Sequence, residues 1–470
     1  MFQICRTFGL EPTAEQRQAI SVFAKFFLCS DEHSLMLLRG SAGTGKTSLA
    51  AAIVRTMISL QRKVVLLAPT GRAAKVFSLT SGVPAGTIHR HIYRQRMFGD
   101  LTNFNLSINL HQHTLFIVDE ASMIANDSMG DSAFGSGCLL DDIIRYVYNN
   151  KGCRLFLIGD KAQLPPVGQE ESPAMSAAVL EGYGLHVFQT DLNEVLRQSA
   201  ESGILYNATV IRQMITHDSV TLLPKVRFRG FADIVMVSGN ELIDELQSSY
   251  RNVGLDETIV ITRSNKRANI YNNGIRNRVL DREEELSQGD YLMVVKNKYV
   301  IDGDDEKHKE VFLIANGDRV RVRRVRHVRE FYGFRFADLL IEFPDYDNKE
   351  MEMTVIIDSL HTDAPALTRE QSQQLYERVM EDYADIPKKA DRLKKLREDK
   401  HYNALQIKYA YAVTCHKAQG GQWEHVYVDQ GYMTDDMVSP GYIHWLYTAF
   451  TRARERLFLV NWQETQIDNN

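Results

Sequence analysis

The segment GSAGTGKT, residues 40–47, constrains the fold of this chain more than any other feature. It matches the pattern G-x-x-x-x-G-K-[ST], follows the apolar run SLMLLRG and opens the helical pattern SLAAAIVRTMI. Its glycines allow a tight backbone turn, so that successive N–H groups and the start of the helix point toward one anion. The pattern predicts a phosphate-binding loop in an α/β domain. The alternative, a plain glycine turn before a helix, explains less because strand, loop and helix occur together.

A nucleoside triphosphate at such a loop needs positive charge and a divalent cation. We expect Lys46 to neutralise the β- and γ-phosphates and the Thr47 hydroxyl to ligate Mg²⁺. The segment LFIVDEAS ends another apolar run with two acids, Asp119 for the metal and Glu120 as the general base that activates water. Taken alone, such a pair of acids more often caps the next helix. The predicted nucleotide-binding loop comprises Gly40, Ser41, Ala42, Gly43, Thr44, Gly45, Lys46 and Thr47.

Short apolar runs that end in polar residues recur along the chain, as in KVVLLAPT, TLFIVDE and RLFLIGD. Such runs are typical of a parallel sheet covered on both faces, with function at the carboxyl ends of the strands. The runs TIVITRS, IKYAYAVT and HVYVDQ predict a second core of the same kind. We expect a first core at 1–190 with a hairpin insert at 91–113, and a second core at 191–288 and 403–470. Residues 289–402 read as an inserted small barrel followed by charged helices.

Composition limits the location and the partners. The net charge of −5 means that a nucleic-acid partner needs a local basic surface rather than bulk charge. Five scattered cysteines lack metal-ligand spacing and argue against a disulfide framework, which indicates a reducing, cytoplasmic compartment. No apolar stretch is long enough to cross a bilayer, so we expect no membrane association.

Nine segments in order complete the pattern: PTAEQRQAI, GSAGTGKT, APTGRAAK, GTIHR, VDEAS, GDKAQLPPVG, LNEVLRQ, YAVTCHKAQGGQW and LYTAFTRAR. Together they resemble the motifs of superfamily 1 helicases, specifically the RecD-like and Dda-like branch, superfamily 1B, that moves 5′ to 3′. Pif-type helicases share several of these motifs. The resemblance covers nearly the whole chain. It implies an α/β fold with two RecA-like parallel-sheet cores, a small hairpin insert in the first, and an SH3-like barrel plus helical insert in the second.

The resemblance also implies roles for single residues around the nucleotide. Gln16 contacts the adenine edge, which favours ATP, and Gln163 senses the γ-phosphate. Arg197 and Arg452 contact the γ-phosphate from the far side of the cleft, with Arg452 as the arginine finger, although either arginine alone would read as a surface ion-pair residue. Gln422 stands where the family often has an acid that meets the ribose, so sugar selectivity is left open.

A track for single-stranded nucleic acid is expected across both cores, from residues at strand ends whose hydroxyls and charges suit phosphate. It comprises Thr70, Arg72, Lys75, Thr87, His89, Pro165, Pro166, Thr262, Asn265, Thr414, His416 and Lys417. His89 by itself is more often a structural histidine. Phe98 and Phe104 of the hairpin insert are predicted as strand-separating wedge residues, and packing of the hairpin onto the core is an equally good interpretation. The alternating Arg319, Arg321 and Arg323 read slightly better as a solvated face than as a basic strip.

The chain is therefore predicted to be an ATP-dependent 5′-to-3′ DNA helicase that uses ATP and Mg²⁺. The expected partners are single-stranded DNA, forked duplex DNA and proteins of a replication or recombination complex, with roles in DNA repair or recombination. We expect a monomer. The alternative is an ATP-regulated nucleic-acid-binding subunit of a recombination or exonuclease complex that does not unwind DNA itself.

Overall fold

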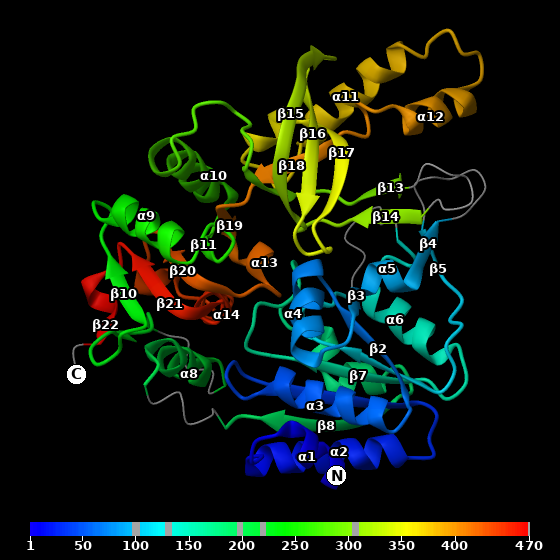
Figure 1. Ribbon diagram of the computed structural model, residues 1–470, viewed down its shortest axis with the longest axis vertical. Coiled ribbons are helices and arrows are strands. Elements are labelled where there is room, and N and C mark those ends of the chain that lie inside the picture. Colours follow the sequence, from blue (N-terminus) through cyan, green and yellow to red (C-terminus); the bar gives the residue numbers. More distant parts are fainter. Residues whose placement is uncertain (96–103, 127–133, 195–200, 217–221, 303–309, 469–470) are drawn as a thin grey trace.

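Six parallel strands form the sheet of the first core in the order β3-β2-β6-β7-β1-β8 (Figure 1). The computed structural model describes residues 1–95, 104–126, 134–194, 201–216, 222–302 and 310–468. The strands are β1 (Ser34–Gly40), β2 (Lys63–Ala68), β3 (Ala85–Thr87), β6 (Thr114–Val118), β7 (Arg154–Gly159) and β8 (His186–Leu192). The parallel register sets Leu37 opposite Leu157 on one side and Gln189 on the other. The expected parallel sheet is confirmed, and its carboxyl ends lie at one edge.

Helices cover both faces of this sheet because its strands are apolar on both sides. They are α1 (Phe2–Phe8), α2 (Ala14–Leu28), α3 (Lys46–Ser59), α4 (Gly71–Ser81), α5 (Ile88–Ile92), α6 (Leu139–Tyr148) and α7 (Ala177–Glu181). Along β1, Met36 and Leu38 pack with α1, α2 and α3, whereas Leu35 and Leu37 pack with α5, α6 and α7. This alternation follows from the two-residue period of a strand.

A second parallel sheet, ordered β10-β21-β20-β11-β19, forms the other core. Its strands are β10 (Ile234–Val237), β11 (Thr258–Thr262), β19 (Ala412–Thr414), β20 (Trp423–Asp429) and β21 (Ala453–Val460). Its helices are α8 (Gly203–Thr216), α9 (Leu242–Asn252), α10 (Asn265–Gly274), α13 (Cys415–Ala418) and α14 (Pro440–Phe450). A two-stranded sheet pairs β9 (Val226–Arg227) with β22 (Ile467–Asp468). Figure 1 shows α8 and α14 on the side of this core that faces the first core.

The inserted region is a closed five-stranded barrel followed by two helices. The barrel strands are β12 (Tyr291–Val294), β15 (Arg319–Phe331), β16 (Phe334–Phe343), β17 (Lys349–Ile356) and β18 (Leu405–Tyr409). The helices α11 (Arg369–Glu381) and α12 (Lys389–Glu398) pack on the barrel through Phe334, Phe336 and Leu375. The sequence placed residues from 403 onward in the second core, but β18 closes the barrel. A buried, apolar strand such as β18 fits the barrel and the parallel sheet of the second core equally well. Its sequence therefore did not indicate which of the two it joins.

A separate hairpin, β13 (Lys298–Asp302) and β14 (Glu310–Ile314), connects the barrel to the first core. The guanidinium carbon of Arg90, on α5, lies 3.9 Å from the ring centroids of both Phe312 and Tyr346. Arg90 Nη2 also donates a hydrogen bond to the Leu313 carbonyl at 2.6 Å. The inserted region is therefore docked on the first core through a stacked arginine.

The arginines of β15 are not a simple solvated face. Arg319 is 7% exposed, lies over the rings of Tyr291 and Trp423, and donates to the Asp256 carbonyl. Arg323 pairs with Glu342 at 2.8 Å. The interpretation as a solvated face, which the sequence slightly favoured, is wrong for Arg319. Two aromatic faces and a carbonyl replace water around its guanidinium.

The insert of the first core begins and ends with β4 (Tyr93–Gln95) and β5 (Phe104–Leu106), which pair antiparallel. Phe98 lies outside the described residues. Phe104 is 3% exposed and stacks on Phe134 with ring centroids 5.5 Å apart. Phe104 thus occupies the packing position that the sequence left open as an alternative to a wedge. Among the described helices, none is both long and apolar enough to cross a membrane.

Candidate nucleotide and nucleic-acid site

The segment between β1 and α3 forms a tight loop at the carboxyl edge of the first sheet. Gly43 and Gly45 both have a φ of 77°, in the left-handed region that favours glycine. A Cβ on Gly40 would lie 3.0 Å from the Lys46 side chain, so glycine lets that chain fold across the loop. Lys46 Nζ donates to the Ser41 carbonyl at 2.7 Å. The loop geometry and its lysine fit the phosphates of a nucleotide.

Thr47 and Asp119 lie together, as the sequence predicted for a metal site. Thr47 Oγ1 donates to Asp119 Oδ2 at 3.3 Å, and the Glu120 N–H donates to Asp119 Oδ1 at 2.9 Å. Burial raises the pKa of Asp119 above its ordinary value, and the charge of Glu120 raises it further. Asp119 is thus a buried carboxylate that lies beside the Thr47 hydroxyl and is repelled by the charge of Glu120. These oxygen donors suit Mg²⁺.

Gln16 belongs to the start of α2 and reaches the phosphate loop. Its side-chain carbonyl accepts from the Thr13 N–H in a capping box, and its Nε2 donates to the Thr44 carbonyl at 3.0 Å. The side chain is 1% exposed. Gln16 therefore ties α2 to the loop, and its contact with adenine stays a prediction. The side chain of Gln422 is exposed, and its contact with the sugar likewise stays a prediction.

The loop after β7 carries Gln163 and is held by the second core. Thr448 Oγ1 accepts from the Leu164 N–H at 2.8 Å, and Gln419 Nε2 donates to the Leu164 carbonyl. His444 Nδ1 lies 2.9 Å from the Ala162 carbonyl. Gln163 is 6% exposed, and its Oε1 has no hydrogen-bond partner among the described residues. An unpaired buried acceptor between the cores fits a residue that meets water or a ligand.

Two residues that sequence reasoning missed contact the phosphate loop from the second core. The Tyr447 hydroxyl, on α14, accepts from the Ala42 N–H at 2.9 Å and donates to Asp160 Oδ2 at 2.6 Å. Burial and Asp160 raise the pKa of Tyr447 well above 10, so the hydroxyl stays a donor. Arg212, on α8, donates to Ser41 Oγ at 2.7 Å. In sequence, a tyrosine in an apolar helix is expected in the core, and an arginine in an amphipathic helix is expected at the surface. Tyr447 lies within the segment LYTAFTRAR, but no signal indicated that it contacts the phosphate loop, and none marked Arg212.

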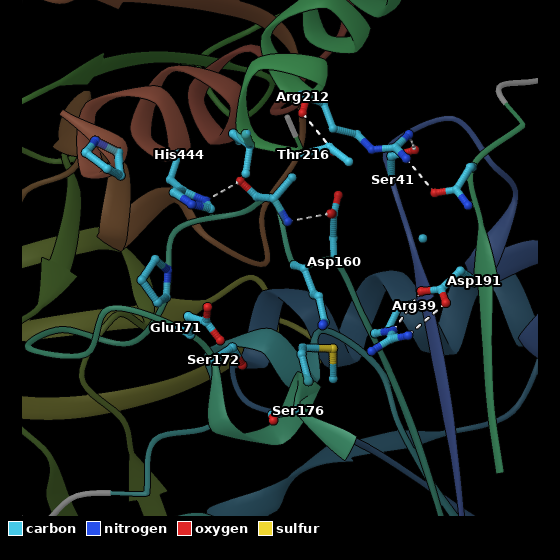
Figure 2. Close-up of a pocket in the computed structure, with 18 of the residues that line it drawn as sticks. Arg39, Ser41, Asp160, Glu171, Ser172, Ser176, Asp191, Arg212, Thr216 and His444 are labelled. Carbon is cyan, nitrogen blue, oxygen red and sulfur yellow. Dashed lines mark hydrogen bonds and ion pairs between the residues drawn. The ribbon is translucent and has the colours of Figure 1, made fainter. Parts of the chain in front are cut away.

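A cavity of about 430 Å³ lies beside these contacts, between the carboxyl ends of β7, β1 and β8 and the second core. Figure 2 shows Arg212 reaching Ser41 on one side of it and the pair Arg39–Asp191 on another. Asp160 and His444 also line it. The cavity is continuous with the phosphate loop, since Gly40 and Ser41 form part of its wall.

Of the two arginines predicted to approach the γ-phosphate, Arg452 is among the described residues. Arg197 lies outside the described residues. Arg452 is 2% exposed and donates to the carbonyls of Thr448 and Gly421 and to Thr451 Oγ1. Arg452 is therefore buried rather than solvated, and its bonds lie within the second core. Its role as an arginine finger stays a prediction.

Three predicted track residues of the first core lie around α4. Thr70 caps this helix by accepting from the Ala73 N–H at 3.2 Å. Arg72 donates to Glu257 and to the Gln422 carbonyl, and Lys75 donates to the Pro344 carbonyl at 2.6 Å. Both cations thus join the first core to the second core and the barrel.

The remaining first-core residues divide into buried and accessible groups. Thr87 is 3% exposed and caps α5, and His89 packs against Phe134 with ring centroids 5.1 Å apart. Burial lowers the pKa of His89 to about 4, so its ring is neutral. Pro166 is buried and Pro165 is partly exposed on the wall of the cavity. The environment of His89 is that of a structural histidine.

In the second core, the parallel register sets Thr262 opposite Thr414 at the carboxyl ends of β11 and β19. Thr262 is fully buried and donates to the Ser264 carbonyl, whereas Thr414 is partly exposed at the start of α13. Asn265 begins α10 nearby. His416 is exposed, and Lys417 donates to Asn316 Oδ1 of the barrel region at 3.1 Å. Burial lowers the pKa of Lys417 to about 8.

Comparison with known proteins gives two family matches and several relatives. A family model described as an AAA domain matches residues 11–217, and one described as a UvrD-like helicase C-terminal domain matches residues 409–460. The ATP-dependent DNA helicase dda of Enterobacteria phage T4 is 26% identical, covering 74% of this chain and 77% of its own. The ATP-dependent RecD2 DNA helicase of Deinococcus radiodurans is 35% identical over 37% of this chain and 21% of its own. A Pif1 helicase from Bacteroides aligns over 98% of this chain and 95% of its own, with 15% identity and a TM-score of 0.48.

Fold and site define a P-loop nucleoside triphosphatase in which two parallel-sheet cores meet at the phosphate loop. The two family matches flank the barrel region, in the order that the motifs predicted. With these matches and relatives, the chain is identified as an ATP-hydrolysing DNA helicase that is similar to those of superfamily 1B.

Proposed function

We propose that this helicase moves 5′ to 3′ along single-stranded DNA and separates forked duplex, with one hydrolysed ATP driving each cycle of core movement. The observation that carries the proposal is the set of contacts from α14 and Gln419 to the phosphate loop and to the loop of Gln163. A ligand at the phosphate loop must change these contacts, so its binding and loss would move one core against the other.

The hydrolysis assigned to the site uses the residues of the first core. The oxygen of a water bonds to the γ-phosphorus, the bond from that phosphorus to the bridging oxygen of ADP breaks, and phosphate leaves. Glu120 accepts the proton of the water, and Gln163 orients it through the unpaired Oε1. Mg²⁺, held by Thr47 and Asp119, would supply charge on the phosphates. Lys46 neutralises the β- and γ-phosphates, and Gln16 and Gln422 are assigned to the adenine and the sugar.

The nucleic-acid track is proposed to run over the strand ends of both cores. Support comes from groups on the two sides that are exposed or partly exposed, namely Thr414, His416 and Lys417 in one core and Arg72 and Lys75 in the other. The acids that hold Arg72, namely Glu257 and Asp345, would be exchanged for DNA phosphates during a cycle. The domain boundaries and the hairpin at 91–113 as a strand-separating element belong to the same proposal, as does a monomeric state. Five free cysteines fit a reducing, cytoplasmic location.

The alternative, a nucleic-acid-binding subunit without unwinding, is not favoured because both named relatives are ATP-dependent DNA helicases. Protein partners of a replication or recombination complex belong to the same proposal, as the resemblance to RecD-like helicases implies.

The test compares the wild-type chain with Lys46→Ala in ATP hydrolysis, with and without single-stranded DNA and RNA. We expect stimulation of the wild type by DNA, and loss of hydrolysis by Lys46→Ala with DNA binding retained. Equal hydrolysis with and without nucleic acid would contradict the coupling. A Lys46→Ala variant that still separates strands would show that ATP turnover does not drive the protein.

A further inference from the structure

An arginine of the second core lies at the phosphate loop without an acidic partner. Arg212 Nη1 donates to Ser41 Oγ at 2.7 Å, and its Nη2 donates to the side-chain oxygen of Asn193. None of the ion pairs formed by the described residues includes Arg212. In the same cavity, Arg39 is neutralised by a bidentate pair with Asp191, whose two bonds are each 2.7 Å long. Unlike Arg39, Arg212 therefore places a positive charge with no paired carboxylate beside the phosphate loop.

Arg212 and the Tyr447 hydroxyl contact adjacent residues of the phosphate loop, Ser41 and Ala42. The charge of Arg212 lowers the pKa of Tyr447, against the larger effect of burial. Tyr447 in turn accepts from the Ala42 N–H of the loop. The guanidinium therefore lies at the first residues of the phosphate loop, beside Ser41. Arg452 differs, since its guanidinium N–H groups donate to oxygens of its own core.

We propose that Arg212 contacts the terminal phosphate of ATP and supplies the positive charge of the second core during hydrolysis. This inference rests on the proposed ATP-driven cycle and names a residue beyond the two arginines expected from the sequence. The planar guanidinium has several donors in a fixed fork, so it can exchange Ser41 Oγ for a phosphate oxygen with little rearrangement. The guanidinium neither gains nor loses a proton during hydrolysis. The oxygen of the water bonds to the γ-phosphorus, the bond from that phosphorus to the bridging oxygen breaks, and ADP leaves. The proton of the water passes to Glu120.

The position of Arg212 also connects hydrolysis to core movement. Arg212 lies on α8, which packs against α14, the helix that carries Tyr447 and Thr448. An arginine that enters the nucleotide site from a separate core is effective only when the cores are closed. Loss of the terminal phosphate would remove its charge partner and favour opening.

The experiment compares Arg212→Gln and Arg212→Lys with wild type and with the control Arg251→Ala. Arg251 is an exposed arginine of the same core, and among the described residues its side chain bonds only to Gln247 of its own helix. Four quantities are measured: kcat and KM for ATP with single-stranded DNA, the Kd for ADP, the Kd for a non-hydrolysable ATP analogue, and Tm. We expect Arg212→Gln to lower kcat about 10³-fold, as loss of an arginine finger does. The Kd for ADP and Tm should stay near wild type, while the analogue binds no more tightly than ADP. Arg212→Lys should recover part of kcat.

A kcat of Arg212→Gln close to that of wild type would overturn the proposal. A fall in kcat accompanied by equal losses in ADP binding and Tm would also overturn it, because that pattern indicates a structural role. Failure of the proposed function is distinguishable, since wild type and Arg251→Ala would then both lack DNA-stimulated hydrolysis in the same assay.

Discussion

The Tyr447 hydroxyl lies 2.6 Å from Asp160 Oδ2 and 2.9 Å from the Ala42 nitrogen, so one side chain of the second core joins two loops of the first. The hydroxyl oxygen of Tyr447 accepts from a loop N–H of the kind that binds phosphate. The hydroxyl also donates its proton to the carboxylate of Asp160, the residue that follows β7. This three-way contact links the phosphate loop to the position of the second core.

Replacing Tyr447 with phenylalanine keeps the ring and removes both hydrogen bonds. The orphaned Asp160 oxygen and Ala42 N–H should lower the free energy of unfolding by about 1–3 kcal/mol. We expect DNA stimulation of kcat to fall about tenfold, because an interaction of 1–2 kcal/mol would no longer couple the cores. Tyr442→Phe is the matched control, since Tyr442 lies on the same helix and bonds to Gln430 away from the loop. A Tyr447→Phe variant with normal stimulation would contradict the link.

Hydrolysis should depend on pH through Asp119. Burial raises the pKa of Asp119, and Glu120 adds to the rise, so protonation competes with Mg²⁺ at a higher pH than for an ordinary aspartate of pKa 3.8. At limiting Mg²⁺, activity should therefore fall as the pH is lowered toward the raised pKa, and excess Mg²⁺ should move the fall to lower pH. Pairs of pH profiles for kcat at two Mg²⁺ concentrations measure this shift. Identical profiles would mean that Asp119 does not hold the metal.

His89 should matter for acid stability rather than for DNA binding. Burial lowers its pKa from 6.5 to about 4. Between these values the unfolded chain takes up a proton and the folded chain does not, so stability is lost as the pH falls from 6.5 toward 4. His89→Leu should reduce the drop in Tm over that range and leave the Kd for single-stranded DNA unchanged, with the exposed His33→Gln as control. A marked loss of DNA affinity in His89→Leu would instead indicate that His89 contacts the nucleic acid.

Lys417 should make DNA binding sensitive to alkaline pH. Burial lowers its pKa to about 8, so the ammonium loses its proton, and its attraction for phosphate, as the pH rises through that value. Lys417→Arg keeps the charge at all accessible pH values and should flatten the dependence of Kd on pH. Lys417→Ala should lower the slope of log Kd against log salt by about one. If Lys417→Arg and wild type respond alike between pH 7 and 9.5, Lys417 does not meet DNA.

Much of the architecture could be predicted because the patterns that carry it are local. The phosphate loop, the acids after β6 and the parallel cores follow from short apolar runs and their polar ends, which set Thr47 beside Asp119 in the fold. The closed barrel is also signalled by strand patterns, although β18 joined it rather than the second core.

The roles of Arg212 and Arg319 could not be predicted because they depend on contacts between segments that are far apart in the chain. Arg212 and Ser41 are 171 positions apart, and nothing in the helix of Arg212 indicates that it faces the loop. Arg319 looked like one member of a charged strand face, but the rings of Tyr291 and Trp423 enclose it. Such positions are decided by packing between domains, which periodicity does not encode.

The most direct test of the account is strand separation by the full chain on duplexes that carry either a 5′ or a 3′ single-stranded tail. With ATP and Mg²⁺, we expect unwinding from the 5′ tail and none from the 3′ tail. Unwinding from the 3′ tail alone would contradict the proposed direction. DNA-stimulated hydrolysis with no unwinding of either substrate would contradict strand separation itself.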